Sequence, residues 1–223
     1  MPTLLLRLQG PLQSWGTRSR FDYRDTWPYP TKSGVVGLLA AALGRDRTED
    51  ISDLAALRLG VRVDRRGVLK VDYQTAQSVV AADLKRLRDV QSWRYFLSDA
   101  AFLVGLEGDR FLLQSLHRAL LNPRFPLYLG RKGYLPSPPP YLPDGLRDEP
   151  LEEALRRYPY LGKGEPREDL LLALEAPQGR LVYDQPVAPF SQRRFGARYV
   201  LEKVLPKEEI PKGPPVWEEA HVD

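Results

Sequence analysis

A polar and basic stretch from Asp72 to Arg94 separates two segments that have the patterns of core strands. Before it, residues 59–64 alternate apolar and polar side chains, and after it residues 101–106 are apolar throughout. The stretch itself has little core-forming periodicity, and its cations are Lys85, Arg86, Arg88 and Arg94. We therefore predict an inserted basic arm, at about residues 72–94, between two strands of one sheet.

The elements around the arm follow one another in the order strand, helix, strand, strand, helix. Residues 4–9 alternate as a strand with one face inward, residues 33–43 carry an apolar helical stripe that stops at Gly44, and Gly108-Asp109 caps a helix over residues 110–120. This is a ferredoxin-like order with one strand still to be supplied by the later chain. We therefore predict an α+β protein with a ferredoxin-like (RRM-like) domain over residues 1–135.

The second part of the chain, residues 136–223, has a different character. It opens with five prolines between Pro136 and Pro143, a composition that favours an extended run over the surface. A short helix near residues 151–158 and strand patterns at 169–174, 180–183 and 197–204 then predict a small β-rich C-terminal unit. The proline-containing tail is expected to be loosely attached.

The composition excludes several classes of protein. The chain has no cysteine, which excludes disulfides, zinc ribbons and thiol catalysis, and its two histidines, His117 and His221, are too few for a histidine-rich metal site. We expect no cofactor and no metal. The longest apolar run, near residues 35–43, is too short to cross a bilayer, and the start lacks the layout of a signal peptide. We therefore expect a cytoplasmic protein that does not contact a membrane.

The net charge of +4 is too small to indicate a nucleic-acid partner, but arginine outnumbers lysine by 25 to 8. Guanidinium groups suit bidentate phosphate contacts and stacking on bases. The composition of a GC-rich thermophile explains this overall bias better, so the positions of the arginines carry more information than their number.

The N-terminal strand breaks at Gly10-Pro11, the next loop carries Trp15, and a helix follows that begins with Thr31-Lys32-Ser33. Helix-start N–H groups attract anions and an aromatic ring offers a stacking face, so this region can hold a phosphate. The alternative is a plain helix cap by Thr31 or Ser33. A nucleotide-binding P-loop is excluded because residue 31 is Thr where that motif requires Gly. The basic residues nearby, which favour RNA, are Arg18, Arg20 and Arg24.

Two further places combine cations with aromatic rings. In the arm, Trp93 adjoins Arg94 and Tyr73 stands at the entry, a combination that holds splayed-out single-stranded RNA, although a solvated basic face is the alternative. Later, two glycines flank an Arg-Lys pair, so the candidates there are Tyr128, Arg131 and Lys132; a glycine-rich loop that closes onto the sheet is the alternative. A fourth, weaker basic cluster contains Arg193, Arg194 and Arg198.

Five segments in this order resemble one known family, the CasD-type subunits of the type I-E CRISPR surveillance complex (Cascade), which belong to the RAMP superfamily of guide-RNA-binding proteins. The segments are 4–16 with 30–39, 72–75, 91–102, 123–132 and, more faintly, 192–200. The resemblance implies a RAMP domain whose arm is a thumb-like hairpin that presses on the 5′ handle of the CRISPR RNA. The RNA-binding residues that it implies, together with the patterns above, are Trp15, Arg18, Arg20, Lys32, Ser33, Tyr73, Arg94, Tyr128, Arg131 and Lys132.

The resemblance also implies partners and the lack of an enzymatic activity. The partners are the CRISPR RNA, the Cascade backbone subunit, the large subunit and, indirectly, target DNA, and a separate subunit cuts the RNA. The main alternative is a metal-independent endoribonuclease that matures CRISPR precursor RNA through Tyr128 and Lys132, but no histidine lies in that loop. A purely structural subunit whose basic face meets acidic protein groups is the third reading.

Overall fold

The computed structural model describes residues 1–17, 22–81 and 84–213. Within this part of the chain, six strands form one sheet in the order β10-β9-β4-β7-β1-β8. Every neighbouring pair in it is antiparallel. Its strands are β1 (Thr3–Gln9), β4 (Arg58–Arg65), β7 (Ala101–Glu107), β8 (Leu146–Arg147), β9 (Leu170–Pro186) and β10 (Phe195–Leu205).

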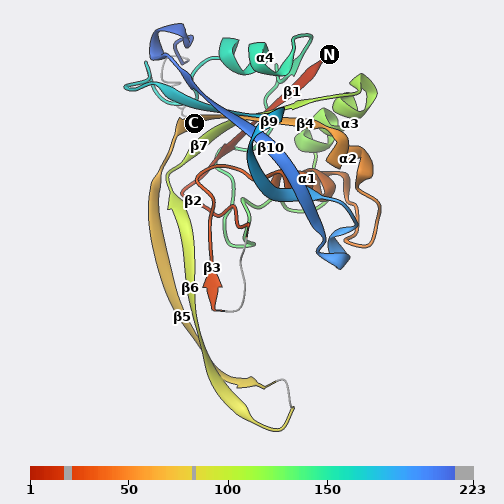
Figure 1. Ribbon diagram of the computed structural model, residues 1–223, viewed down its shortest axis with the longest axis vertical. Coiled ribbons are helices and arrows are strands. Elements are labelled where there is room, and N and C mark those ends of the chain that lie inside the picture. The colour runs from red at the N-terminus through yellow and green to blue at the C-terminus, as the bar shows by residue number, and fades with distance from the viewer. Residues whose placement is uncertain (18–21, 82–83, 214–223) are drawn as a thin grey trace, which may run out of the picture.

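Helices cover both faces of this sheet, as Figure 1 shows for α1 and α4 on opposite sides of the strands. On one face, α1 (Lys32–Leu43), α2 (Ser52–Ala56) and α3 (Arg110–Leu121) pack on the sheet side chains of Leu4, Leu6 and Leu8. On the other face, α4 (Leu151–Arg157) packs on Leu5. The expectation that β1 buries only one face is therefore wrong, because a strand between two layers needs apolar side chains on both.

The ends of helix α1 are set by two residues that the sequence identified. Thr31 accepts a hydrogen bond from the backbone N–H of Gly34 at 3.3 Å, and Gly44 ends the helix with a φ of +77°. Glycine adopts this left-handed conformation without steric cost. Gly34 also lies against Trp15, since a Cβ atom there would stand 2.8 Å from the indole ring. The helix start is thus a plain Thr cap packed on a tryptophan.

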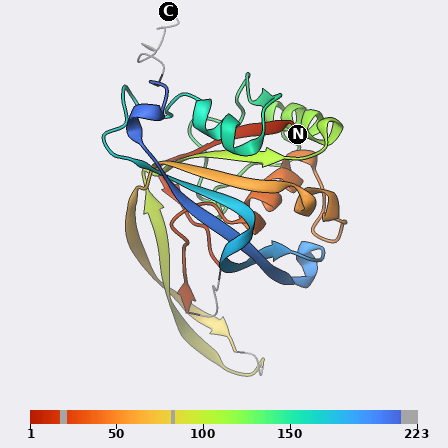
Figure 2. The same cartoon turned by 45° about the horizontal axis from the view of Figure 1, so that its top comes forward.

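A long hairpin of β5 (Val68–Val80) and β6 (Leu87–Ser98) projects from the body in both ribbon views (Figures 1 and 2). At its root, β6 also pairs with β2 (Leu12–Gln13) and, in parallel, with β3 (Tyr23–Arg24). The predicted arm over residues 72–94 lies within this hairpin, whose strands begin and end closer to the body. Most of its side chains are exposed on both faces, and this explains why the sequence shows no alternation there.

The strands after residue 136 join the same sheet. β9 pairs with the open edge of β4, β10 pairs with β9, and β8 pairs with β1. The apolar side chains of Leu172 and Leu174 on β9 are buried against α4, in one cluster with Leu5 of β1. The two strand patterns at 169–174 and 180–183 are one strand, bent where its register with β10 shifts.

The proline-rich segment runs beside the outer edge of β1, where the backbone N–H of Arg7 donates to the carbonyl of Pro140 at 2.9 Å. The predicted tail beyond residue 213, with His221, lies outside the described residues. No helix in the described ranges is long and apolar enough to cross a membrane.

Candidate nucleic-acid interface

The hairpin has two faces of different chemistry, because successive residues of a strand point to opposite sides and paired residues share a side. Tyr73 lies opposite Trp93, and Tyr23 pairs with Trp93 from the other edge. We call this side the aromatic face; over residues 69–75 and 91–97 its members are Leu69, Val71, Tyr73, Thr75, Gln91, Trp93, Tyr95 and Leu97, together with Tyr23 of β3. The other side is the cationic face; its members are Lys70, Asp72, Gln74, Ser92, Arg94, Phe96 and Arg24.

This geometry separates two residues that the sequence analysis treated as one contact. Trp93 and Arg94 are neighbours in β6 and therefore point to opposite faces. The same holds for Tyr73 and Arg94. A single nucleotide held against one face can contact the ring or the guanidinium, but not both.

Arg94 and Arg24 are register partners on the cationic face. Arg94 is half-buried and donates from Nε to Ser92 Oγ at 3.1 Å. Among the described residues, no carboxylate lies within ion-pair distance of it. Asp72, the residue opposite Arg94 in β5, instead accepts from the side-chain amide of Gln74. The guanidinium of Arg94 therefore retains donors for an anion.

Arg131 fastens the loop of residues 128–134 to the root of the arm. Its Nη2 donates to the carbonyl oxygen of Tyr95 at 2.9 Å and to that of Arg24 at 3.2 Å, while Nη1 donates to the hydroxyl of Tyr134 at 2.8 Å. The ring of Tyr134 in turn lies 6.0 Å from that of Phe96 on the cationic face. We call Arg24, Arg94 and Arg131 the arm-root cluster. Arg131 holds the backbone that carries the other two.

The loop can reach the arm because Gly130 has no side chain. Its φ is +95°, and a Cβ atom there would stand 1.8 Å from the carbonyl oxygen of Ser14. Ser14 donates its backbone N–H to Leu129 and its hydroxyl to the carbonyl of Tyr95, at 3.0 and 3.2 Å. The segments around residues 14, 95 and 131 therefore converge. Tyr128 is half-buried in this loop and Lys132 is exposed.

Trp15 does not take part in this surface. It is 1% exposed, its indole N–H donates to Gln13 Oε1 at 3.2 Å, and its ring packs on Gly34. The expectation that Trp15 offers a stacking face on an open loop is corrected by this burial. Burial of this large apolar ring beside α1 stabilises the core.

Lys32 is also removed from solvent, at 2% exposure. Its Nζ forms an ion pair with Glu175 at 2.8 Å, and its backbone N–H donates to Asp184 Oδ2 at 2.7 Å. Burial lowers the pKa of Lys32, and the neighbouring Glu175 acts in the opposite direction. The anion at the start of α1 is thus the carboxylate of Asp184 rather than a phosphate, which corrects the phosphate-contact role expected for Lys32.

Asp184 also binds Arg198, a member of the fourth basic cluster, through two hydrogen bonds of 2.6 and 2.8 Å. Arg198 is 8% exposed, so it is part of the core, whereas Arg193 and Arg194 are exposed in the turn before β10. No signal in the sequence predicts this network, because Glu175 and Asp184 lie on β9, far along the chain from α1.

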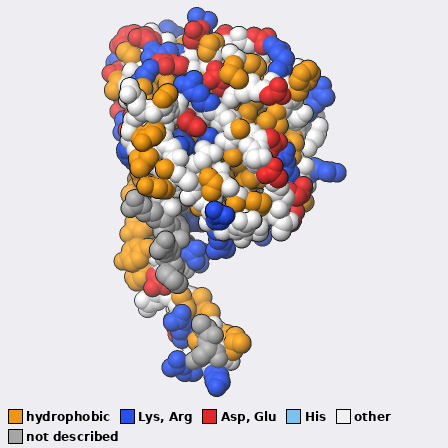
Figure 3. All heavy atoms as spheres, turned by 45° about the vertical axis from the view of Figure 1, so that its right-hand side comes forward, with side chains coloured by type: hydrophobic (Ala, Val, Ile, Leu, Met, Phe, Trp, Pro, Cys, Tyr) orange, Lys and Arg blue, Asp and Glu red, His pale blue; other side chains and the backbone are white. Residues whose placement is uncertain are grey.

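The remaining predicted residues lie apart from the arm-root cluster. Ser33 is half-buried in the first turn of α1, with its hydroxyl 3.5 Å from that of Thr31. Arg18 and Arg20 lie outside the described residues. Tyr23 was missed by the sequence analysis, and its only signal was its place in a stretch too polar to be core. Figure 3 shows further Lys and Arg side chains toward the far end of the arm, where the sequence has Lys85, Arg86 and Arg88.

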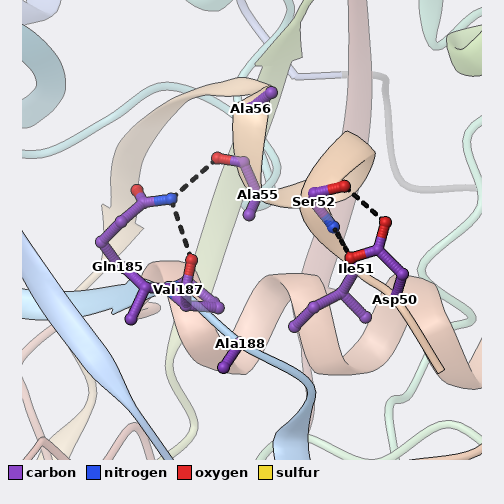
Figure 4. Close-up of a pocket in the computed structure, with 9 residues that line it drawn as sticks. Asp50, Ile51, Ser52, Ala55, Ala56, Gln185, Val187 and Ala188 are labelled. Carbon is purple, nitrogen blue, oxygen red and sulfur yellow. Dashed lines mark hydrogen bonds between the residues drawn. The ribbon is translucent and has the colours of Figure 1, made fainter. Parts of the chain in front are cut away.

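A hollow of about 290 Å³ lies on the body, between α2 and the end of β9 (Figure 4). Gln185 spans it by donating to the carbonyl of Ala55 at 2.9 Å, and Asp50 accepts from Ser52 on its other side. No Lys or Arg lines it. No group of three His, Cys, Asp or Glu side chains in the described ranges is arranged to hold a metal ion.

Comparisons with known proteins agree on one family. A family model described as CRISPR-associated protein (Cas_Cas5) matches residues 3–201. The protein named CRISPR system Cascade subunit CasD from Escherichia coli (strain K12) is 34% identical over 176 residues, which cover 71% of this chain and 78% of that protein.

Two solved structures are similar over almost the whole chain. One, titled "Crystal structure of Cas protein", is 74% identical with a TM-score of 0.83, and the match covers 96% of this chain and 100% of that one. The other, a chain of a structure titled "CRISPR RNA-guided surveillance complex", is 30% identical with a TM-score of 0.75, covering 96% and 95%.

Proposed function

Since this chain belongs to the Cas5 family of CRISPR-associated proteins, we propose that it is the subunit of a type I-E Cascade complex that caps the 5′ handle of the CRISPR RNA. The similarity to a Cascade subunit and to a chain of an RNA-guided complex supports this assignment. Its partners in this proposal are the CRISPR RNA, the backbone subunit and the large subunit, with target DNA contacted only indirectly, all in the cytoplasm.

The observation that carries the proposal is the arm-root cluster. Arg24 and Arg94 are side by side on the cationic face, and Arg131 ties them to the loop that carries Lys132. Guanidinium groups in fixed positions suit phosphate oxygens, because planar donors can bond two oxygens at once. The RNA-contacting residues that we propose are Arg24, Arg94, Tyr128, Arg131 and Lys132, with Ser33 and the undescribed Arg18 and Arg20 as further predictions.

We also propose that the body is a ferredoxin-like RAMP domain. The order β8-β1-β7-β4 supports this, because it is the strand order of that fold when β8 is counted as its last strand. β8 has only two residues, and β9 with β10 extends the sheet from the other edge. A domain boundary near residue 135 stays a prediction, and so does the role of the hairpin as a thumb.

The proposed role is binding without cleavage. Tyr128 and Lys132 lie in a loop that holds no histidine. His117 is engaged elsewhere, since its Nε2 is hydrogen-bonded to the carbonyl of Leu142 at 2.9 Å and its ring packs on Tyr141. A general acid or base must reach the reacting atoms, and this histidine is held under the proline-rich segment.

The proposal is tested by photo-crosslinking handle RNA to the protein within the assembled complex and mapping the modified peptides. We expect crosslinks in residues 22–24, 92–96 and 128–132. Crosslinks confined to α4 and the proline-rich segment would contradict the placement. A parallel incubation with repeat RNA in EDTA should leave the RNA intact, and specific cleavage lost in Tyr128→Phe would contradict the absence of catalysis.

A further inference from the structure

Strand β10 (Phe195–Leu205) is one edge of the six-stranded sheet, because it pairs with β9 alone. Within the described ranges, its backbone groups make no hydrogen bond to any other segment. An edge strand presents a row of unpaired N–H and C=O groups on which another strand can form. With 11 residues, β10 is longer than a typical strand of about 5–6 residues, so this row is long.

Two of the devices that protect open edges in other proteins are absent from β10. It contains no proline, and both shifts in its register with β9 insert residues on β9, so β10 itself runs without a bulge. Its charged side chains are all bound within the chain; the pairs are Arg198 with Asp184, Glu202 with Tyr29, and Lys203 with Glu152. An approaching strand therefore meets no unpaired charge of β10.

An uncharged patch reaches the open edge on the face of the sheet that carries α4. Leu181 of β9 is paired with Tyr199 of β10, and Leu201 follows Tyr199 on the same face, since alternate residues of a strand share a face. Leu201 pairs with Leu174, whose side chain is buried against α4. Leu181, Tyr199 and Leu201 are exposed by 45%, 45% and 37%. Exposed apolar groups that lie together mark interaction surfaces.

The sequence of β10 is complementary to itself in one antiparallel register. Val200 is the middle residue of the strand, and a two-fold axis at Val200 gives every residue from 195 to 205 an opposite residue in a second copy. Tyr199 then lies opposite Leu201 of the second copy, and Arg198 lies opposite Glu202. Cross-strand pairs of apolar groups and of opposite charges are stabilising, and no two like charges meet. Moving the axis by one residue either way places Arg198 opposite a valine and leaves strand ends unpaired.

We propose that the free chain forms a symmetric dimer through β10, in which the two copies pair antiparallel about Val200 and their sheets become one continuous sheet. Backbone hydrogen bonds form along the edge, and the contact of Tyr199 with Leu201 joins the two apolar patches. A second copy is the occupant because the register depends on the match of β10 with its own sequence. The dimer concerns the chain before it enters a complex, so it does not rest on the proposed function.

The test uses the full purified chain and measures its mass against concentration by sedimentation equilibrium, with thermal melting to check folding. In the first variant, Tyr199→Lys with Leu201→Lys places like charges opposite each other across the two-fold axis. In the second variant, Tyr199→Glu with Leu201→Glu does the same with negative charges. Both positions are exposed, so the fold should not change. The control, Phe111→Lys with Leu121→Lys, alters two exposed apolar residues on α3.

We expect the native chain and the control to form dimers, and each charged variant to raise the dissociation constant of the dimer about a hundredfold or more, because like charges are opposed in the interface. An equal mixture of the two charged variants should dimerise again, since Lys then faces Glu.

Four results would each overturn the proposal: a native chain that stays monomeric, a dimer that the charged variants leave intact, a control that dissociates as they do, or a mixture that stays monomeric. A monomeric native chain whose charged variants enter the complex poorly would also overturn it, by assigning the edge of β10 to another subunit.

Discussion

Arg131 donates a hydrogen bond to the carbonyl oxygen of Tyr95 at 2.9 Å, and so joins a loop to a strand 36 positions earlier in the chain. The same carbonyl accepts from the hydroxyl of Ser14. Three of the five N–H donors of Arg131 are used within the protein, and the other two remain for the proposed contact with RNA. Its first role is to fix the root of the arm.

Arg131→Lys is therefore not a conservative change. A single ammonium cannot reproduce the fork of donors to Tyr95, Arg24 and Tyr134, and leaves polar atoms unpaired. We expect the free energy of unfolding, measured in urea, to fall by about 1–3 kcal/mol. Lys132→Ala is the control, because that side chain is exposed. Equal stability of Arg131→Lys and the native chain would show that these hydrogen bonds do not stabilise the fold.

Arg94→Ala should weaken binding of handle RNA and make it less sensitive to salt. Losing one phosphate contact reduces the slope of log affinity against log salt by about one unit. Arg157→Ala is the matched control, since Arg157 is exposed on α4, on the other side of the sheet. Binding titrations at several salt concentrations measure both quantities. A slope that changes equally in both variants would point to a nonspecific effect of net charge.

Gly130→Ala and Gly133→Ala form a matched pair in one loop. Alanine at 130 would need a left-handed φ and would collide with the carbonyl of Ser14, whereas nothing lies within 4 Å of a Cβ at 133. Alanine at a strained position destabilises by more than about 1 kcal/mol, while a compatible glycine replacement is neutral or stabilising. Thermal melting distinguishes the two. Similar melting temperatures for both variants would contradict the close approach.

Asp184→Asn should destabilise the protein strongly. The substitution leaves the buried guanidinium of Arg198 without its bidentate carboxylate and weakens the anion at the start of α1. Removing one partner of a buried pair costs about 3–5 kcal/mol. Glu153→Gln, in an exposed pair with Arg157, should change stability by less than about 1 kcal/mol. Urea unfolding of both variants gives the comparison, and a loss at Asp184 no larger than at Glu153 would mean that the network is not stabilising.

Because of Tyr29, the stability of the protein should fall at alkaline pH. Its burial, reinforced by a hydrogen bond to Glu202, raises its pKa to about 12. Above its ordinary pKa of 10.0 the unfolded chain releases this proton while the folded chain keeps it, so the contribution of Tyr29 to stability falls as the pH rises from 10.0 to about 12. Tyr29→Phe removes this dependence. Urea unfolding at pH 9 and 11 should show a smaller decrease for the variant; an identical decrease would contradict the assignment.

Local signals in the sequence predicted local structure well. Thr31 and Gly44 limit α1, and Asp109 caps α3 by accepting from Leu112, because caps depend only on residues within one turn. The order of the strands and helices and the place of the arm were also predictable. The family was identified from segments whose order and spacing match, and the comparisons confirm it.

The features that could not be predicted from the sequence depend on contacts between residues far apart in the chain. The sequence marked Lys32 as a cation at a helix start, but its ion pair is with Glu175, 143 residues away. The burial of Trp15 could not be predicted for the same reason, since nothing near it in the chain predicts that its ring packs on Gly34. The two faces of the arm could be derived only once the register of β5 and β6 was known.

In the described part of the chain, the hairpin is attached to the body at one end only. Strand β5 extends nine residues beyond Val71, the partner of Tyr95, so at about 3.4 Å per residue its far end stands about 30 Å from the anchorage at Ser14 and Arg131. A tilt of a few degrees at that anchorage is thereby amplified into a displacement of about 2 Å at the free end. The contacts that fix the root of the hairpin therefore also determine how far its far end can move.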